Sequence, residues 1–376
     1  MKNNYFVKRN ERFKELMAKE EEDAIIAVSP ENVLYSTGTY LTTQRLIPDR
    51  LAIAVFPQKQ EPIFIVCGIE ESGVIEQTWI KDIRAYIEFK ESPIQLLVDI
   101  LKDIGLEKGC IGIEKHYLNT YHYTELINAM PNAKFVESRD IFEEVRMIKD
   151  INEIEILAKA AKATRKALEA AFLLAKSGDT EFDIANQMKI NLLNQGADGI
   201  AFMVLGTGRR SMLVHPIPAD DISISPGDII KVDFGGVFSS GYYSDFARSV
   251  VVEKPSQFQI EVYKKLATIQ KKIINTMKPG IRCCDLFNKC KELYEENELP
   301  LDMPHIGHGL GLGLHEDPIL SPLNEKKIQK NMVINVEPLV IVNGFCIHLE
   351  DLVLITDNGV KILTGAKMSD ELPIIG

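Results

Sequence analysis

An Asn-Gly dipeptide between two apolar runs constrains the fold of this 376-residue chain more than any other feature. It is Asn343-Gly344 in "INVEPLVIVNGFCIHLEDLVLI", and in this setting Asn-Gly is the strongest short-range signal for a two-residue hairpin loop. If Val342 pairs with Phe345, counting outward along both strands places Glu337 opposite Glu350. Like charges directly opposite each other destabilise a sheet, so this pair indicates that a cation lies between them.

A second hairpin is predicted in "IKVDFGGVFSSGYYSDFARSV". A three-residue loop over 238–240, followed by Gly241 with a positive φ, would pair Asp233 with Asp245. Apolar residues alternate with Asp233 along its strand, so its carboxylate is predicted to lie on the sheet face opposite the core. Two repulsive carboxylate pairs in one domain predict metal binding.

A histidine between the two hairpins adds a neutral nitrogen ligand. It is His308 in "HIGHGLGLGLHEDP". Four carboxylates and one imidazole suit hard to borderline divalent ions such as Mn²⁺, Co²⁺, Fe²⁺ or Zn²⁺. One ion would have more carboxylates than it needs, so we expect two ions that share bridging carboxylates and a water or hydroxide. The predicted metal ligands are Asp233, Asp245, His308, Glu337 and Glu350.

Three motifs in order carry a resemblance to a known family: "D…GY.SD.AR", "GHGLGLGLHE.P" and "VEP…LED.VLIT". Over roughly residues 150–376 the chain resembles the pita-bread metallopeptidase family (M24), in particular its Xaa-Pro aminopeptidase and Xaa-Pro dipeptidase (prolidase) branch. The resemblance implies that Asp245 and Glu350 bridge two metal ions, while Asp233 and His308 each bind one. Mn²⁺ is the expected metal, with Co²⁺ or Zn²⁺ as alternatives. The implied reaction is hydrolysis of the N-terminal Xaa-Pro bond of dipeptides or short peptides by a bridging hydroxide.

The same resemblance implies roles for further residues. His215 in "LVHPIP" resembles a histidine that contacts the substrate near the scissile carbonyl, and His315 in "LHEDP" resembles one that hydrogen-bonds the substrate or the tetrahedral intermediate. Pre-aligned donors of this kind contribute about 100-fold or more in rate. Glu337 is expected to carry the proton from water to the leaving nitrogen, so the expected catalytic residues are His215, His315 and Glu337.

The chain departs from the family pattern at three places. Relatives often carry a histidine where this chain has Pro304, while His305 lies one position later, so a substrate role for His305 is not expected. Relatives often carry an arginine where this chain has His348, which shares a strand face with Glu350 and is expected to contact the substrate. A histidine cannot reproduce the bidentate fork of an arginine, which predicts an altered substrate choice. The spacing from Asp233 to Asp245 is one residue longer than in most relatives, and the longer loop is expected to absorb it.

Two other functions remain open at this stage. One is a creatinase-like hydrolase of a small non-peptide amide or amidino compound, and the other is a catalytically silent binding protein on the same fold. A silent protein of this kind usually loses metal ligands, whereas this chain keeps all five. Metal analysis separates the silent protein, and a panel of Xaa-Pro peptides and creatine-like compounds separates the two enzymes.

Composition limits the expected number of domains, the partners and the cellular compartment. A chain of 376 residues with 45% hydrophobic content can bury two substantial cores, which favours two domains. The net charge of −11 argues against nucleic acid or an anionic membrane as a partner. The start "MKNNYFVKRNERF" has no apolar signal region, and six cysteines form no CxxC pair, so a cytoplasmic protein with reduced thiols is expected. The family resemblance implies a homodimer.

The expected fold is a two-domain α/β protein. Residues 1–148 resemble the creatinase-type N-terminal α/β domain in "RFKELMAKEEEDAIIAVSPENVLYSTG", and residues 149–376 are expected to form a pita-bread α+β catalytic domain with an internal pseudo-two-fold. A helix is predicted over 152–176, before Gly178. Further helices are predicted to start at Thr180 and Ser256, where Asp183 and Gln259 complete capping-box signals.

Overall fold

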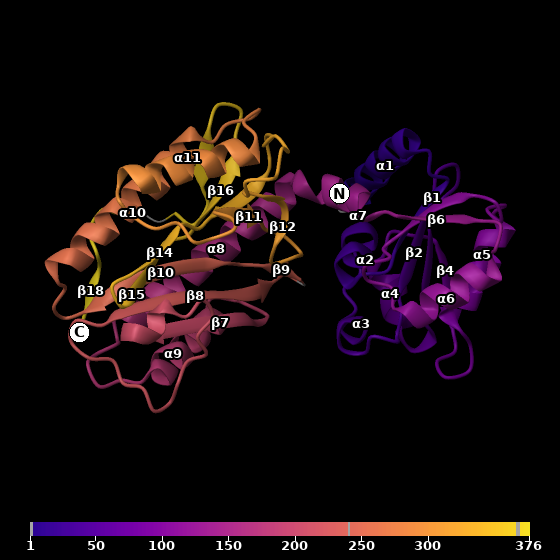
Figure 1. Ribbon diagram of the computed structural model, residues 1–376. Helices are drawn as coiled ribbons and strands as arrows, with labels where there is room; N and C mark the ends of the chain where they lie inside the picture. The colour runs from indigo at the N-terminus through magenta and orange to yellow at the C-terminus, as the bar shows by residue number, and fades with distance from the viewer. Residues whose placement is uncertain (1–2, 240, 366–368) are drawn as a thin grey trace. The chain divides into compact units, whose positions relative to one another are not determined.

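The structure, a computed structural model, describes residues 3–239, 241–365 and 369–376. The chain divides into one compact unit that ends at Arg146 and a second that begins at Met147, and each has hydrophobic cores of its own (Figure 1). The division falls after Arg146 rather than after residue 148, the boundary expected from the sequence. Within the described part of the chain, no helix is both long and apolar enough to cross a membrane.

The first unit is built on a six-stranded mixed sheet in the order β4-β3-β2-β1-β5-β6. Strands β4 and β6 form the two edges of this sheet. The strands are β1 (Ala24–Ala27), β2 (Ile53–Pro57), β3 (Ile63–Cys67), β4 (Asp82–Tyr86), β5 (Cys110–Ile113) and β6 (Lys134–Glu137). The helices are α1 (Asn3–Glu20), α2 (Pro30–Thr37), α3 (Thr42–Leu46), α4 (Glu71–Gln77), α5 (Pro93–Asp103), α6 (Thr120–Ala129) and α7 (Arg139–Met147).

The second unit repeats one plan twice: a helix pair followed by mainly antiparallel strands. The first half has α8 (Ile151–Phe172) and α9 (Glu181–Asn194), with strands β7 (Gly199–Thr207), β8 (Ile229–Phe238), β9 (Tyr242–Tyr243), β10 (Phe246–Val252) and the late β18 (Ile374–Ile375). The second half has α10 (Gln257–Thr276) and α11 (Cys283–Glu296), which lie side by side in Figure 1. Its strands are β11 (Gly307–Gly309), β12 (Glu316–Ile319), β13 (Val333–Val336), β14 (Leu339–Val342), β15 (Phe345–His348), β16 (Asp351–Ile355) and β17 (Val360–Ile362). Each helix pair covers its own sheet with a separate core, which is the expected internal two-fold of the pita-bread fold.

Reciprocal capping boxes start the helices of both halves. Thr180 and Asp183 cap α9, and Ser256 and Gln259 cap α10, so both capping predictions are confirmed. In each box the side chain at the cap accepts from the backbone three residues on, and the later side chain accepts from the backbone of the cap. Helix α8 ends at Phe172, before the predicted end at residue 176.

The predicted register of the later hairpin is confirmed. Val342 pairs with Phe345 next to the Asn343-Gly344 loop, and the β14–β15 ladder continues to Leu339 opposite His348. Beyond a short break, β13 pairs with β16 in the same register, starting with Val336 opposite Asp351. Glu337 and Glu350 therefore lie opposite each other in the break between the two ladders.

The predicted register of the earlier hairpin is wrong by two residues. Phe238 pairs with Tyr242, so the loop lies one position later than expected; it includes Ser240, which is outside the described residues. Asp233 consequently pairs with Ala247 rather than with Asp245. Because side chains alternate with a period of two, a shift of two leaves both aspartates on one face as diagonal neighbours.

Candidate metal centre

All five predicted metal ligands lie together in the second unit. In each of three overlapping groups of side chains, the potential ligand atoms lie within 4.8 Å of one another. The groups are Asp233, Asp245 and Glu350; His308, Glu337 and Glu350; and Asp245, His308 and His315. Asp245, His308 and Glu350 each belong to two of these groups, so these three side chains connect the groups into one cluster.

Both halves of the unit contribute to this cluster. Asp233 lies on β8 and Asp245 directly before β10, whereas His308 lies on β11 and Glu350 directly before β16. The backbone N–H of Glu350 donates to the carbonyl of Ala247 at 3.1 Å, which joins β10 to the later hairpin at the cluster itself. The ligands thus lie on paired strands or directly next to them.

Nearby side chains strengthen the same junction. Arg248 Nη2 lies 2.8 Å from Asp351 Oδ2, and its Nη1 donates to the carbonyl of Glu350. The hydroxyl of Ser249 accepts from the backbone N–H of His348 at 2.9 Å. These contacts hold β10 against β15 and β16 on the side of the cluster.

Several buried polar atoms in the cluster have no hydrogen-bond partner among the described residues. They are Asp233 Oδ1, Glu337 Oε1, both carboxylate oxygens of Glu350, and Nε2 of His308. Leaving such atoms unpaired costs free energy, and a buried unpaired charge costs more. Divalent cations among these atoms would satisfy them, so the donor set fits the metal ions that the sequence implies.

Three of the carboxyls hold their protons more tightly than free acids do. Burial, together with the nearby charge of Glu337, raises the pKa of Asp233 to about 7. Burial and the charge of Asp233 raise the pKa of Asp245 well above its usual value. Burial and the charge of Asp245 do the same to the pKa of Glu350. A bound cation would replace these protons, because metal ligands must be deprotonated.

Glu337 behaves differently because histidines surround it. Burial alone would raise its pKa. The neighbouring His305, whose Nδ1 lies 3.4 Å from Glu337 Oε1, has the opposite effect. The charges of His308 and His348 act in the same direction as His305, and the pKa falls to about 2. His308 Nε2 lies 3.3 Å from the same oxygen, and burial lowers the pKa of His308. At neutral pH the arrangement therefore combines an ionised Glu337 with a neutral His308, which is the protonation state that coordination needs.

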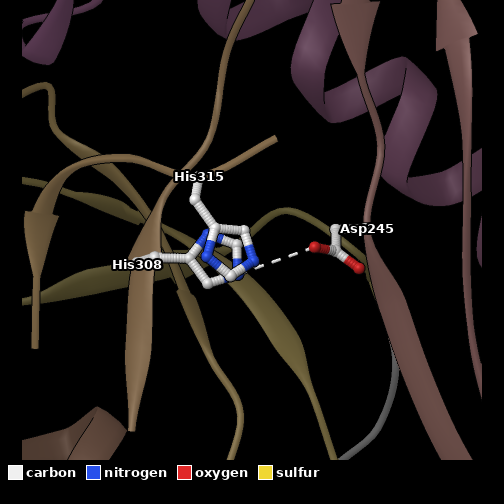
Figure 2. Close-up of side chains that lie close together, drawn as sticks. All are labelled: Asp245, His308 and His315. Carbon is white, nitrogen blue, oxygen red and sulfur yellow. Dashed lines mark ion pairs between the residues drawn. The ribbon is translucent and has the colours of Figure 1, made fainter. Parts of the chain in front are cut away.

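His315 lies directly against His308 (Figure 2). The two rings stack with centroids 3.8 Å apart at an angle of 15°, and His308 Nε2 lies 3.6 Å from Asp245 Oδ2. Burial and the charge of His308 lower the pKa of His315 to about 4, so its ring is neutral at pH 7. His315 is close enough to Asp245 and His308 to share an ion with them, a geometry that the sequence does not predict.

The remaining histidines border the cluster at different depths. His348 is buried, its Nε2 lies 3.8 Å from Glu337 Oε2, and burial lowers its pKa to about 4. His305 lies beside Glu337, although the sequence assigns it no role. His215 is exposed on the segment after the short 3-10 helix Gly208–Met212 and belongs to none of the three ligand groups. A protonated His215 would lower the pKa of His315.

The sequence does not identify two buried lysines close to these residues. Lys149 Nζ lies 2.9 Å from Glu316 Oε2, an ion pair in which both side chains are buried, and Glu316 directly follows His315. Lys231 lies on β8 two positions before Asp233 and is 2% exposed. The one signal for Lys231 is a charged residue inside an apolar strand pattern, which does not by itself say what the residue contacts.

Known families and structures match almost the whole chain. Residues 155–357 match the model of metallopeptidase family M24, and residues 9–148 match that of the creatinase/prolidase N-terminal domain. An Xaa-Pro dipeptidase of Pyrococcus furiosus is 30% identical over 361 residues, which cover 95% of this chain and 97% of the relative. The prolidase from Pyrococcus horikoshii OT3 has a TM-score of 0.83 at 28% identity, with 96% of this chain and 99% of that chain covered. An Xaa-Pro dipeptidase from Bacillus anthracis has the same fold, with a TM-score of 0.88 at 24% identity over 98% of this chain and 100% of that chain.

Proposed function

The chain belongs to metallopeptidase family M24, and we propose that it hydrolyses the Xaa-Pro bond of dipeptides or short peptides with the help of two divalent metal ions. The set of buried carboxylate and imidazole atoms without partners among the described residues is the observation that carries this proposal. Similarity to the Xaa-Pro dipeptidase of Pyrococcus furiosus and the prolidase of Pyrococcus horikoshii supports the substrate class.

Asp233, Asp245, His308, Glu337 and Glu350 would hold these ions, because their potential ligand atoms lie together. Bound ions would supply Lewis acidity, bind the substrate amine and carbonyl, and lower the pKa of water. We propose Mn²⁺ as the native metal, because carboxylates dominate the donor set.

The protein's own residues would orient the substrate and move protons. Glu337, with its pKa lowered to about 2, is ionised at neutral pH and would accept a proton from water and deliver it to the leaving nitrogen. His315, neutral at pH 7, would donate a hydrogen bond to the oxygen of the scissile carbonyl as negative charge develops there. His215 and His348 would contact the substrate from the exposed and the buried side of the site, respectively.

An Asp245→Ala variant tests this proposal. We expect it to lose metal and to hydrolyse Xaa-Pro dipeptides at least about 1,000-fold more slowly, because a proposed metal ligand at the centre of the cluster is removed. The measurements are metal content by mass spectrometry and kcat/KM with Mn²⁺ present. Asp103→Ala, at an exposed acid of α5 in the first unit, is the matched control and should change neither. Full activity in Asp245→Ala would reject the mechanism.

A substrate panel separates the proposed activity from the other functions considered. It contains Xaa-Pro dipeptides, Xaa-Pro tripeptides and creatine-like compounds, each tested with added Mn²⁺ or Co²⁺. We expect cleavage of the Xaa-Pro peptides. Cleavage of the creatine-like compounds alone would favour the creatinase-like alternative, and a metal-free, inactive protein would favour the binding protein.

We further propose a cytoplasmic homodimer, which light scattering tests as a mass of twice 42.3 kDa.

A further inference from the structure

Lys231 is a buried lysine beside the site that the proposed chemistry does not use. It is 2% exposed and shares a face of β8 with Asp233. Among residues 3–239, 241–365 and 369–376, no carboxylate forms an ion pair with its Nζ. A lysine in such a place must be stabilised by hydrogen bonds.

The ammonium group of Lys231 binds the main chain of another segment. It donates to the carbonyl oxygens of Leu213 and Val214, the second at 2.9 Å. These are the two residues directly before His215. An ammonium group has three donors and no acceptor, so it can donate to two neighbouring carbonyls at once.

The segment that receives these hydrogen bonds has little hydrophobic burial of its own. The side chains of Leu213 and Val214 are 51% and 47% exposed. The segment is held on either side, where Ser211 Oγ accepts from the N–H of Cys346 at 3.0 Å and the carbonyl of Pro216 accepts from the N–H of Leu205 at 3.1 Å. Lys231 supplies the side-chain contact to the part in between.

We propose that Lys231 is a positioning residue that fixes the main chain directly before His215 and thereby sets where the imidazole of His215 meets the substrate. The inference rests on the proposed function, in which His215 contacts the substrate. Because His215 directly follows the two anchored carbonyls, a shift of this segment would move its imidazole. Misplacement of a catalytic group by about 1 Å can reduce rates about 100-fold.

Lys231→Met removes both hydrogen bonds and keeps most of the length of the side chain. We expect kcat/KM for an Xaa-Pro dipeptide to fall about 10-fold to 100-fold, with the metal content unchanged. In a His215→Ala background the same substitution should change kcat/KM less than about 2-fold, because Lys231 acts through His215. Equal effects in both backgrounds, or loss of metal in Lys231→Met, would overturn the proposal.

Hydrogen exchange tests the anchor without any substrate. In Lys231→Met, peptides that cover 212–216 should exchange at least about 10-fold faster, while peptides from α8 and α10 keep their protection. Lys265→Met is the matched control, because Lys265 Nζ also donates to a backbone carbonyl, that of Asn297 at 2.8 Å. Unchanged exchange over 212–216 would overturn the proposal.

The two readouts separate this inference from the proposed function. If the unmodified protein cleaves no Xaa-Pro peptide but exchange over 212–216 depends on Lys231, the proposed function fails and the anchor remains. If the peptide is cleaved but exchange and coupling to His215 are absent, the anchor fails alone. Should Lys231→Met not fold, Lys231→Gln keeps two N–H donors on a shorter side chain and is expected to give the same pattern with smaller changes.

Discussion

Asp233, Asp245 and Glu350 are buried beside one another, and each holds a proton more tightly than an exposed carboxyl does. A metal ion must displace these protons before it can bind, so proton and metal compete for the same oxygens. The competition is strongest at pH values at which the carboxyls are protonated. It is expected to disappear above the raised pKa values, of which that of Asp233 is about 7.

Metal should therefore stabilise the protein more at high pH than at low pH. In the metal-free protein the pKa of Asp233 rises from 3.8 to about 7, so its contribution to stability is fully present below about pH 4 and is lost as the pH rises through about 7. When metal is bound, Asp233 is already deprotonated, so this loss of stability does not occur as the pH rises. We expect the Mn²⁺-induced rise in melting temperature to be larger at about pH 8 than at about pH 5.5.

Thermal melts of the metal-free and Mn²⁺-loaded protein across this range measure the effect. Burial also raises the pKa of Glu22 in the first unit to about 7, but Glu22 is present in both forms, so its contribution cancels in the difference. A metal-induced rise that is equal at both pH values would contradict the competition between protons and metal at the cluster.

A single substitution tests whether His315 binds metal or donates a hydrogen bond to the substrate. His315→Gln is expected to keep its metal and to lose about 100-fold in kcat/KM, because a donor to the developing charge is removed while the five proposed ligands remain. His308→Gln is the matched control and is expected to lose metal. Metal content by mass spectrometry decides the question: metal loss in His315→Gln would make His315 a ligand, as its proximity to Asp245 also permits.

At the residue scale, sequence motifs identify residue types but not every contact. The five proposed ligands are recognisable because each has a defined place in a motif, and the structure brings them together. Lys231 lies outside the motifs, and its partners are the carbonyls of Leu213 and Val214. Backbone acceptors carry no sequence identity, so no pattern of residues could have indicated this contact.

At the scale of elements, the two hairpins show why one register was predictable and the other was not. In the later hairpin, Asn343 and Gly344 have φ values of +45° and +92°, which a tight two-residue loop requires, and their sequence specifies that loop. In the earlier hairpin, Ser239 takes a φ of +44°, a conformation that serine rarely adopts, so the loop lies later than its glycine suggests. Ser244 Oγ also accepts from the N–H of Gly236 and interrupts the ladder.

The strands of this earlier hairpin approach each other so closely at Gly235 that a side chain at this position is expected to destabilise the protein. A Cβ atom at Gly235 would lie 1.8 Å from the carbonyl oxygen of Ser244, a backbone atom that cannot move without Asp245. We expect Gly235→Ala to lower the free energy of unfolding by about 1–3 kcal/mol and to weaken metal binding. Urea denaturation and metal titration measure both quantities.

Gly199→Ala is the matched control for this substitution. Gly199 lies on β7 of the same sheet, and a Cβ atom there would meet nothing within 4 Å. We expect the control to change stability by less than about 0.5 kcal/mol. Equal effects of the two substitutions would show that the general cost of replacing a strand glycine, and not the contact with Ser244, is responsible.

At the scale of the whole molecule, the order of helices and hairpins predicts the repeated halves of the second unit. Capping signals and hairpin loops are local, so the sequence displays them directly. How the halves meet is not local: it depends on contacts such as that from the N–H of Glu350 to the carbonyl of Ala247. The cluster forms at this junction, which is why its residues are predictable and its distances are not.

Every proposed ligand lies in the unit that begins at Met147, while the unit that ends at Arg146 has a core of its own. We therefore expect two calorimetric transitions, of which Mn²⁺ raises only one. At a free metal concentration of 100 times Kd the added stability is about 2.7 kcal/mol, enough to move that transition by several degrees. In Asp245→Ala neither transition should move. If Mn²⁺ moved both transitions of the unmodified protein together, the two units would unfold as one cooperative block, and the stability of each would depend on the other.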